Sequence, residues 1–188
     1  MIKIGITGSL ASGKTTASKF ISNKKGPLFS ADLNVKKLYS NRSFKKLIAK
    51  KLNIKINSQF TKNIKKKLLE DKNTLIKLEK IIHPLIRKKM MDFSKKNKNK
   101  KLLFFEIPLL IESNLKKYFD LVIFVRSKKS LRLKRYKLNG GSVSLFSLLD
   151  SHQIKDTKKM KFCDYIVINN SSLNVLQKQL LNIIKKYE

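Results

Sequence analysis

The 188-residue chain has one cysteine, three prolines and no tryptophan, and only 12 acidic residues against 44 basic ones. Cys163 stands alone, which excludes an internal disulfide and a cysteine-based metal cluster. No apolar run reaches the roughly 18 residues that cross a bilayer. The apolar stretch at the start of the chain is also too short for a secretory signal. These absences predict a soluble, cytoplasmic protein that does not act at a membrane.

The shortage of acidic residues leaves a formal net charge of +32, a balance found in nucleic-acid-binding proteins. However, only five of the 44 basic residues are arginines, and Lys, Asn and Ile, all abundant here, are the residues of A/T-rich codons. The lysines are spread along the whole chain and are not confined to a tail. Compositional drift therefore explains the charge better than a specific nucleic-acid partner does.

Five short apolar segments alternate with amphipathic stretches, the pattern of a parallel sheet covered by helices. Their hydrophobicity is continuous, which predicts strands buried on both faces. A hydrophobic content of 41% with 11 Phe is enough to build a core. We therefore expect a three-layer α/β fold with a five-stranded parallel sheet, its strands at residues 2–7, 27–30, 102–106, 121–125 and 165–168.

The stretch from about residue 32 to 99 is too long for an ordinary crossover helix and predicts an inserted helical subdomain. Its apolar residues recur at spacings of three and four, as in amphipathic helices. Pro84 is expected to break or kink its helix, and the lysine/asparagine run at 95–101 to form a solvated turn. Further helices are expected from Lys14, at 128–138 and at 173–187.

The segment Gly8-Ser-Leu-Ala-Ser-Gly-Lys-Thr15 matches the phosphate-loop pattern and directly follows the first strand. Backbone N–H groups of such a loop cradle phosphates, Lys14 reaches the β- and γ-phosphates, and the Thr15 hydroxyl ligates Mg²⁺. The sequence therefore predicts a P-loop NTPase-like fold. The loop alone does not distinguish a GTPase, a DNA-dependent ATPase and a small-molecule kinase.

Acidic residues are so scarce that those at strand ends are informative. Asp32 follows the second strand at the sheet edge where substrates bind, and its carboxylate suits a general base or a helix N-cap. Glu106 ends the third strand, where an acid holds a metal through water, organises a substrate or simply meets solvent. His83, next to Pro84, suits an anionic ligand, although a lone histidine more often has a structural role.

Several segments occur together in a characteristic order: the phosphate loop, Ser-Ala-Asp32, Ile-His-Pro-Leu-Ile-Arg87, Glu-Ile-Pro-Leu-Leu-Ile-Glu112 and Asp-Tyr-Ile-Val-Ile-Asn169. In this order and spacing the chain resembles the dephospho-CoA kinases over essentially its whole length. The resemblance implies transfer of the ATP γ-phosphate to the ribose 3′-hydroxyl of dephospho-CoA, the last step of coenzyme A synthesis. ATP and Mg²⁺ are then the expected cofactors, and a monomer is expected.

The resemblance also implies roles for single residues. Asp32 corresponds to the general base, and Lys14 and Arg135 complete the catalytic set. The insertion at about 32–99 becomes the acceptor-binding domain, between core segments 1–31, 100–138 and 162–188, and residues 139–161 form a helical lid. The residues expected to bind ATP are Ala11, Ser12, Gly13, Lys14, Thr15 and Thr16, and those expected to bind the acceptor are His83, Arg87 and Glu106.

The chain also departs from the family pattern. Ser30 stands where the family usually has Asp, and Ser9 and Ala11 replace glycines at unspecified positions of the loop. In the lid, Asn139 and Asp156 stand where arginines are common. Lysine lacks the bidentate fork of arginine, so the lysines near Asp156 are expected to be only partial substitutes: Lys155, Lys158 and Lys159. A kinase of another small alcohol or nucleotide, and a basic ATP-dependent nucleic-acid-binding protein, remain the alternatives.

Overall fold

The computed structural model describes residues 1–71 and 73–188 and divides the chain into two compact units. The first unit comprises 1–31 and 93–188, and the second comprises 32–92. The second unit ends before the predicted boundary near residue 99. The reason is that Phe93 packs in the first unit, with its ring centroid 5.6 Å from that of Phe29 and 5.4 Å from that of Phe105.

A five-stranded, fully parallel sheet forms the centre of the first unit, as predicted. The strand order is β2-β3-β1-β4-β5, so the chain order reverses at the central strand β1. In such sheets, ligands bind outside the carboxyl end of the strands at this reversal. The strands are β1 (Ile2–Thr7), β2 (Leu28–Ser30), β3 (Leu102–Glu106), β4 (Leu121–Arg126) and β5 (Tyr165–Ile168).

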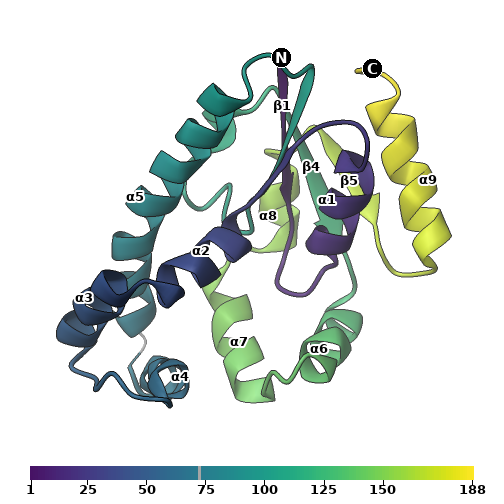
Figure 1. The fold of residues 1–188 in the computed structure, drawn as a ribbon. Helices are drawn as coiled ribbons and strands as arrows, with labels where there is room; N and C mark the ends of the chain where they lie inside the picture. Colours follow the sequence, from purple (N-terminus) through teal and green to yellow (C-terminus); the bar gives the residue numbers. More distant parts are fainter. Residues whose placement is uncertain (72) are drawn as a thin grey trace. The chain divides into compact units, whose positions relative to one another are not determined.

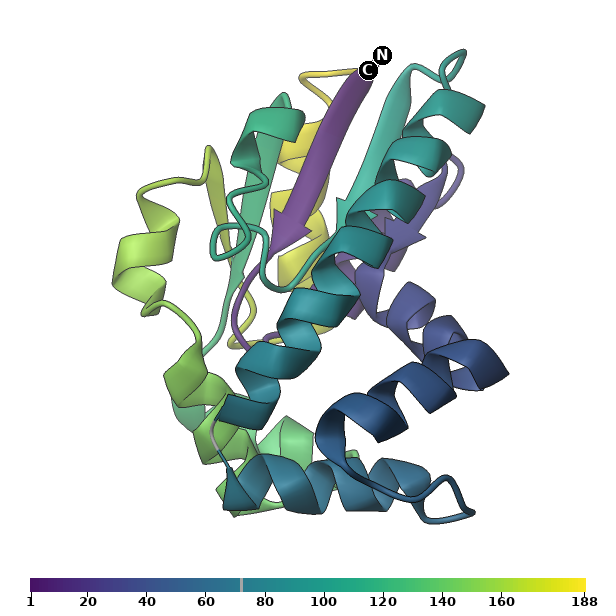
Figure 2. The same ribbon diagram turned by 90° about the vertical axis from the view of Figure 1, so that its left-hand side faces the viewer.

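Helices α1 and α9 cover one face of the sheet, and in Figure 2 the strands stand in front of α9. Their shared core includes Ile4 and Ile6 of β1 and Leu180 of α9, all fully buried. A second cluster is aromatic and consists of Phe29, Phe93, Phe105 and Phe119. The helices of this unit are α1 (Lys14–Ser22), the short 3₁₀ helix η1 (Lys116–Tyr118), α6 (Lys129–Leu138), α7 (Val143–His152), α8 (Asp156–Met160) and α9 (Leu173–Ile184).

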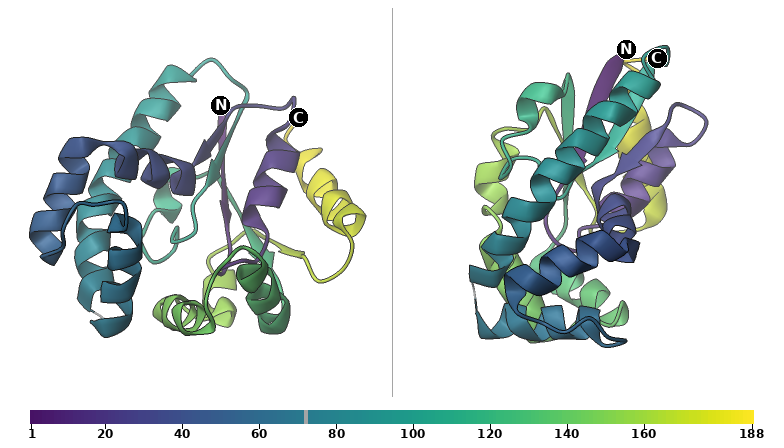
Figure 3. Two further views of the ribbon diagram at one scale, coloured as in Figure 1. Left: turned by 60° about the horizontal axis from the view of Figure 1, so that its bottom comes forward. Right: turned by 60° about the vertical axis from the view of Figure 1, so that its left-hand side comes forward.

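Helices α6 and α7 lie side by side, as the left view of Figure 3 shows. The ring of Tyr136 on α6 lies 5.6 Å from that of Phe146 on α7. The guanidinium of Arg132 also lies over Phe146, at 5.7 Å from its centroid, which is cation–π geometry. The hydroxyl of Ser142 caps α7 by accepting from the Leu145 N–H at 3.2 Å. The expected lid is therefore packed against α6.

The second unit is helical, as the spacing of its apolar residues predicts. Buried side chains recur every four residues on α3 and α4, so each helix presents one apolar face. The side chain of Asn41 caps α3 by accepting from the Phe44 N–H at 3.0 Å. The helices are α2 (Ala31–Ser40), α3 (Arg42–Leu52), α4 (Phe60–Glu70) and α5 (Asn73–Lys96), and the buried residues are Phe44, Ile48, Leu52, Phe60, Ile64 and Leu68.

Pro84 lies inside α5 and does not end it, which corrects the expectation of a break (Figure 1). Proline removes one backbone donor and crowds the preceding turn, at a cost of roughly 3 kcal/mol. Burial of Leu78, Ile86 and Met90 on either side of it offsets this cost in the 24-residue helix. Because α5 continues to Lys96, the solvated turn predicted at 95–101 is shorter than expected. Across the described residues, no helix combines the length and the apolar character needed to cross a bilayer.

Candidate nucleotide-binding and catalytic site

The loop between β1 and α1 has backbone angles that require the two glycines of the phosphate-loop pattern. Gly8 has φ +150° and Gly13 has φ +95°, both in the region that favours glycine, and Ala11 has φ +57°. A Cβ atom on Gly8 would overlap the carbonyl oxygen of Val125, and one on Gly13 would overlap the amide of Asn169. The motif therefore folds as the tight loop that phosphate binding needs.

Cationic and amide groups hold the carbonyl oxygens of this loop. Arg132 Nη1 donates to the Leu10 carbonyl at 3.2 Å, and Asn169 Nδ2 and Arg135 Nη1 donate to the Ser12 carbonyl at 2.9 and 3.4 Å. In a trans peptide the N–H points opposite to the carbonyl. The N–H groups that follow Leu10 and Ser12 therefore point away from these donors, as expected of a loop whose amides bind an anion.

Lys14, the lysine of the motif, opens α1 and is largely buried. Its Nζ donates to the carbonyl of Ser9 at 2.7 Å, across the loop. An ammonium group held at the loop is suited to neutralise phosphate charge. The expected position of Lys14 at the phosphate site is consistent with this contact.

Arg135 supports the loop from α6. Besides the Ser12 carbonyl, its guanidinium donates to Ser127 Oγ at 3.0 Å and to the Asn169 carbonyl at 3.1 Å. The predicted catalytic arginine thus ties the loop to the ends of β4 and β5. In the sequence, Asn169 was noted only as the last residue of a motif. The structure shows that its side-chain amide holds the Ser12 carbonyl of the loop.

Thr15 and Glu106 come together at the carboxyl end of β3. The Thr15 hydroxyl donates to the Glu106 carboxylate, and Glu106 is only 1% exposed, so it is not a solvated strand end. Mg²⁺ prefers oxygen ligands and is usually held by one or two protein oxygens together with phosphates and water. This hydroxyl–carboxylate pair fits such a site. No cluster of three or more His, Cys, Asp or Glu occurs among residues 1–71 and 73–188 that could hold a metal by itself.

The segment expected to form the lid contacts the phosphate loop through a residue of α8 and one in the turn before it. The Ser9 hydroxyl donates to Asp156, and the Leu10 N–H donates to Gln153 Oε1 at 3.3 Å. Asp156, which stands where an arginine was expected, is therefore bonded to the loop through a carboxylate.

Lys159 is not available as a substitute for a lid arginine, which corrects one expectation. It is fully buried, and its Nζ lies 2.5 Å from Glu112 Oε1 and 3.4 Å from Gln153 Oε1. A buried ammonium requires such a partner, so the ion pair with Glu112 fixes the side chain in the interior. Lys155 and Lys158 are exposed.

Arg132 lies on the helix predicted at 128–138, and sequence reasoning assigned it no role. Arg132 is buried, and its Nη1 lies 2.5 Å from Asp150 Oδ1, while Lys129 Nζ lies 3.3 Å from the other carboxylate oxygen. Arg132 and Arg135 are three residues apart and so share one side of α6. This spacing was the available signal that both arginines face the loop.

Comparison with known proteins distinguishes among the families that use a phosphate loop. The family model of dephospho-CoA kinase matches residues 2–174. The chain belongs to the dephospho-CoA kinase family. The dephospho-CoA kinase of Rickettsia typhi is 31% identical over 189 residues, covering 100% of this chain and 98% of the relative. That of Bartonella henselae is 34% identical over 190 residues, covering 97% and 96%.

Solved structures agree with membership of the dephospho-CoA kinase family. The dephospho-CoA kinase of Campylobacter jejuni matches with a TM-score of 0.66 and 25% identity, covering 98% of this chain and 96% of that one. A shikimate kinase from Acinetobacter baumannii matches with a TM-score of 0.57 and 16% identity over 99% of this chain and 94% of that one, which shows a shared fold alone. The resemblance and the P-loop kinase fold predicted from the sequence are thus confirmed.

The residues that the dephospho-CoA kinase resemblance singles out are divided between the two units. The first unit brings the phosphate loop, Glu106 and Arg135 together. Asp32, His83 and Arg87 belong to the second unit. Asp32 is the second residue of α2, and His83 and Arg87 are four residues apart on α5, on one side of that helix. The roles of these three residues stay predictions.

Proposed function

We propose that this chain transfers the γ-phosphoryl group of ATP to the ribose 3′-hydroxyl of dephospho-CoA, giving coenzyme A and ADP. The observation that carries the proposal is the match to the dephospho-CoA kinase family over residues 2–174. The phosphate loop, with the Thr15–Glu106 pair beside it, supports the nucleotide half of the reaction.

The loop amides and Lys14 bind the phosphates of ATP and stabilise the charge that develops on the transferred group. Thr15 Oγ1 and the Glu106 carboxylate would hold Mg²⁺, which neutralises charge on the β- and γ-phosphate oxygens when bound. Ala11, Ser12, Gly13 and Thr16 complete the ATP-binding segment. Arg135 keeps the loop in shape through its contacts with Ser12, Ser127 and Asn169.

Asp32 acts as the general base on the acceptor. The 3′-oxygen forms a bond to the γ-phosphorus while the bond from that phosphorus to the β,γ-bridging oxygen breaks, and the hydroxyl proton passes to the Asp32 carboxylate. The position of Asp32 in the chain supports this role. It follows the carboxyl end of β2 by two residues, and Ser30 at that end is paired with Glu106 of β3.

His83 and Arg87 bind anionic groups of dephospho-CoA. One helical turn separates them on α5, so a single phosphate group can contact both. The guanidinium of Arg87 offers two parallel donors that match phosphate oxygens. Glu106, which belongs to the first unit, also helps to bind the acceptor, in addition to its hydrogen bond with Thr15.

The test is turnover of the purified chain with ATP, Mg²⁺ and dephospho-CoA, with ADP and coenzyme A both quantified. We expect equal amounts of the two products and their loss in Lys14→Ala. A nucleoside, a nucleotide or shikimate used faster than dephospho-CoA would overturn the proposed acceptor. ATP hydrolysis that needs DNA or RNA and resists salt would instead support the nucleic-acid alternative.

Asp32→Asn tests the base. Removing a general base lowers turnover by on the order of 10² to 10⁴, whereas ATP binding should change little because Asp32 is outside the phosphate loop. Unchanged turnover would remove Asp32 from the mechanism while leaving the activity itself established.

A further inference from the structure

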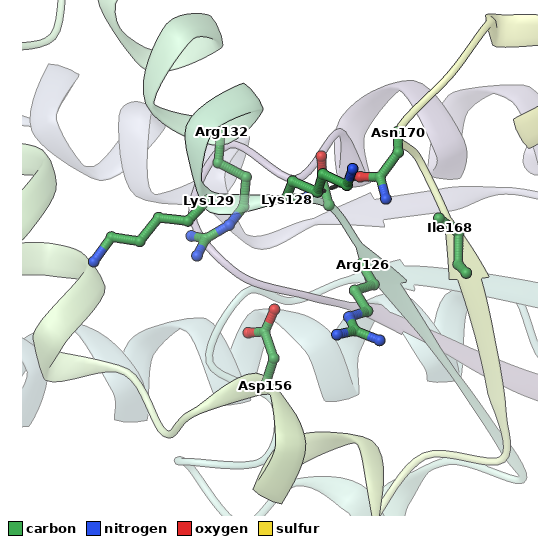
Figure 4. A pocket seen from close by; sticks show the side chains of 8 residues that line it. Arg126, Lys128, Lys129, Arg132, Asp156, Ile168 and Asn170 are labelled. Atoms are coloured by element: carbon green, nitrogen blue, oxygen red, sulfur yellow. Dashed lines mark hydrogen bonds between the residues drawn. The ribbon is translucent and has the colours of Figure 1, made fainter.

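A pocket of about 310 Å³ lies in the first unit, beside the phosphate loop but not within it. Four cationic side chains, one carboxylate and one amide are among the groups that line it, and Figure 4 shows Arg126, Arg132 and Asp156 around a common space. Residues 8–15 of the phosphate loop are not among the lining residues. The charged and amide residues are Arg126, Lys128, Lys129, Arg132, Asp156 and Asn170.

The pocket lies on the face of the sheet away from α1. Val125 of β4 and Val167 of β5 are paired neighbours, and both belong to the core formed with α1 and α9. Successive side chains of a strand point to opposite faces. Arg126 and Ile168, which follow these valines and are also paired, therefore point to the other face. The phosphate loop opens α1, so the pocket lies beside the loop. Two of its lining residues contact the loop, Arg132 at the Leu10 carbonyl and Asp156 at the Ser9 hydroxyl.

The charges around the pocket do not balance. Asp150 pairs with both Arg132 and Lys129, and Asp156 accepts from the Ser9 hydroxyl. These two carboxylates face four cations, which leaves an excess of 4 − 2 = +2. Arg126 and Lys128 form no ion pair with any carboxylate of the described residues. An anion that enters the pocket would offset this excess.

The pocket also contains a buried donor without an acceptor. The side chain of Arg132 is 7% exposed, and its Nε has no hydrogen-bond partner. Buried donors in folded proteins are nearly always bonded to protein or to a bound group. The first turn of α6 starts at the same place, and its N-cap, Lys128, makes no side-chain capping bond. Free N–H groups at a helix N-terminus favour an anion.

We propose that this pocket binds inorganic phosphate or pyrophosphate at a site separate from the nucleotide loop. Guanidinium groups match phosphate oxygens through paired donors. Arg126 and Arg132 supply this geometry, and Lys128 and the start of α6 add positive charge. Asp156 lines the pocket as well and repels an anion on its own side, so the bound group lies toward the two arginines.

Isothermal titration calorimetry with pyrophosphate tests the site in the Lys14→Ala variant, in which the nucleotide loop is weakened. We expect saturable binding of one pyrophosphate per chain. Arg126→Ala in the same background should weaken it about tenfold or more, because a charge-assisted bond is lost. Lys185→Ala is the matched control, since it removes an exposed charge on a distant helix end and should leave the affinity unchanged. Inorganic phosphate in a second titration shows whether one phosphate group is enough.

Absence of binding in Lys14→Ala, or an equal loss in Arg126→Ala and Lys185→Ala, would overturn the site. If Lys14→Ala does not fold, the wild-type chain serves instead. It should then bind two pyrophosphates, and Arg126→Ala should bind one. Kinase activity enters neither measurement, so the result is independent of the proposed function.

Discussion

The buried ion pair between Lys159 and Glu112 offers a quantitative prediction about the lid. Lys159→Met keeps the length of the side chain and removes its charge. Glu112 Oε1 then keeps only the Ile154 N–H, at 3.2 Å, of the donors found here, and Glu112 Oε2 is buried without a partner already. The variant therefore leaves a carboxylate in the interior with too few donors.

The expected loss of folding free energy is about 3 kcal/mol. Breaking a buried pair by removing one partner costs roughly 3–5 kcal/mol. Lys159 is fully buried, but the Glu112 side chain is 15% exposed, so solvent relieves part of the cost. Total stabilities of about 5–15 kcal/mol make this a large fraction.

Equilibrium urea denaturation followed by circular dichroism measures this loss. With a slope of about 2 kcal/mol per M, the midpoint should fall by about 1.5 M. Lys158→Met is the matched control, because Lys158 is exposed on the same short helix and its replacement should change stability by less than about 0.5 kcal/mol. Glu112→Gln added to Lys159→Met removes the stranded charge and should recover about 1–2 kcal/mol.

Two results would refute the reasoning. One is a loss in Lys159→Met no larger than that in Lys158→Met. The other is a double variant less stable than Lys159→Met, since this would show that the buried carboxylate is not the source of the cost.

Three further predictions concern the loop and the thiol. Arg135→Lys removes the guanidinium fork that reaches Ser12, Ser127 and Asn169. The loss of about 1.4 kcal/mol should raise the KM for ATP about tenfold. Initial-rate assays measure this change, with Lys137→Arg as the control. Gly13→Ala should abolish ATP binding in calorimetry, because a Cβ there overlaps the Asn169 amide at a strained φ; binding equal to that of the wild type would contradict the loop geometry. Burial raises the pKa of the Cys163 thiol to about 11, so at pH 8 native protein should be alkylated about a hundredfold more slowly than urea-unfolded protein, as mass spectrometry would show.

The fold was predictable wherever local pattern determines local structure. The strand before the phosphate loop and Leu102–Glu106 were predicted with their observed bounds, because continuous apolar runs beside a motif leave few alternatives. The break considered at Pro84 does not occur, because a helix that buries apolar residues on both sides of a proline tolerates one missing donor. The end of the second unit was also misplaced, since only tertiary contacts place Phe93 with Phe29.

Site residues could be predicted where a sequence motif specifies the functional side chains. They could not be predicted where residues from distant segments hold the loop in place. Lys14 and Thr15 follow from the loop pattern. Spacing along the chain does not show that Arg132 reaches the Leu10 carbonyl, 122 residues away, or that Lys159 is buried against Glu112. The lysine substitution predicted for Lys159 failed for this reason. A side chain's role depends on which carboxylate lies nearby, and here carboxylates are few.

The scarcity of carboxylates also explains how a chain of charge +32 can build an orderly site. Glu106 and Asp156 bond to the phosphate loop, and Asp150 bonds to Arg132, which supports the loop. Glu112 bonds to Lys159, which in turn contacts Gln153 beside the loop. Two of them also determine which of the many available cations is buried: Glu112 pairs with Lys159, and Asp150 pairs with Arg132. Exposed lysines are interchangeable at small cost, whereas moving one of these carboxylates would change which cation is buried. The arrangement of the site is thus encoded in the acidic minority, and the excess of lysine on the surface leaves it intact.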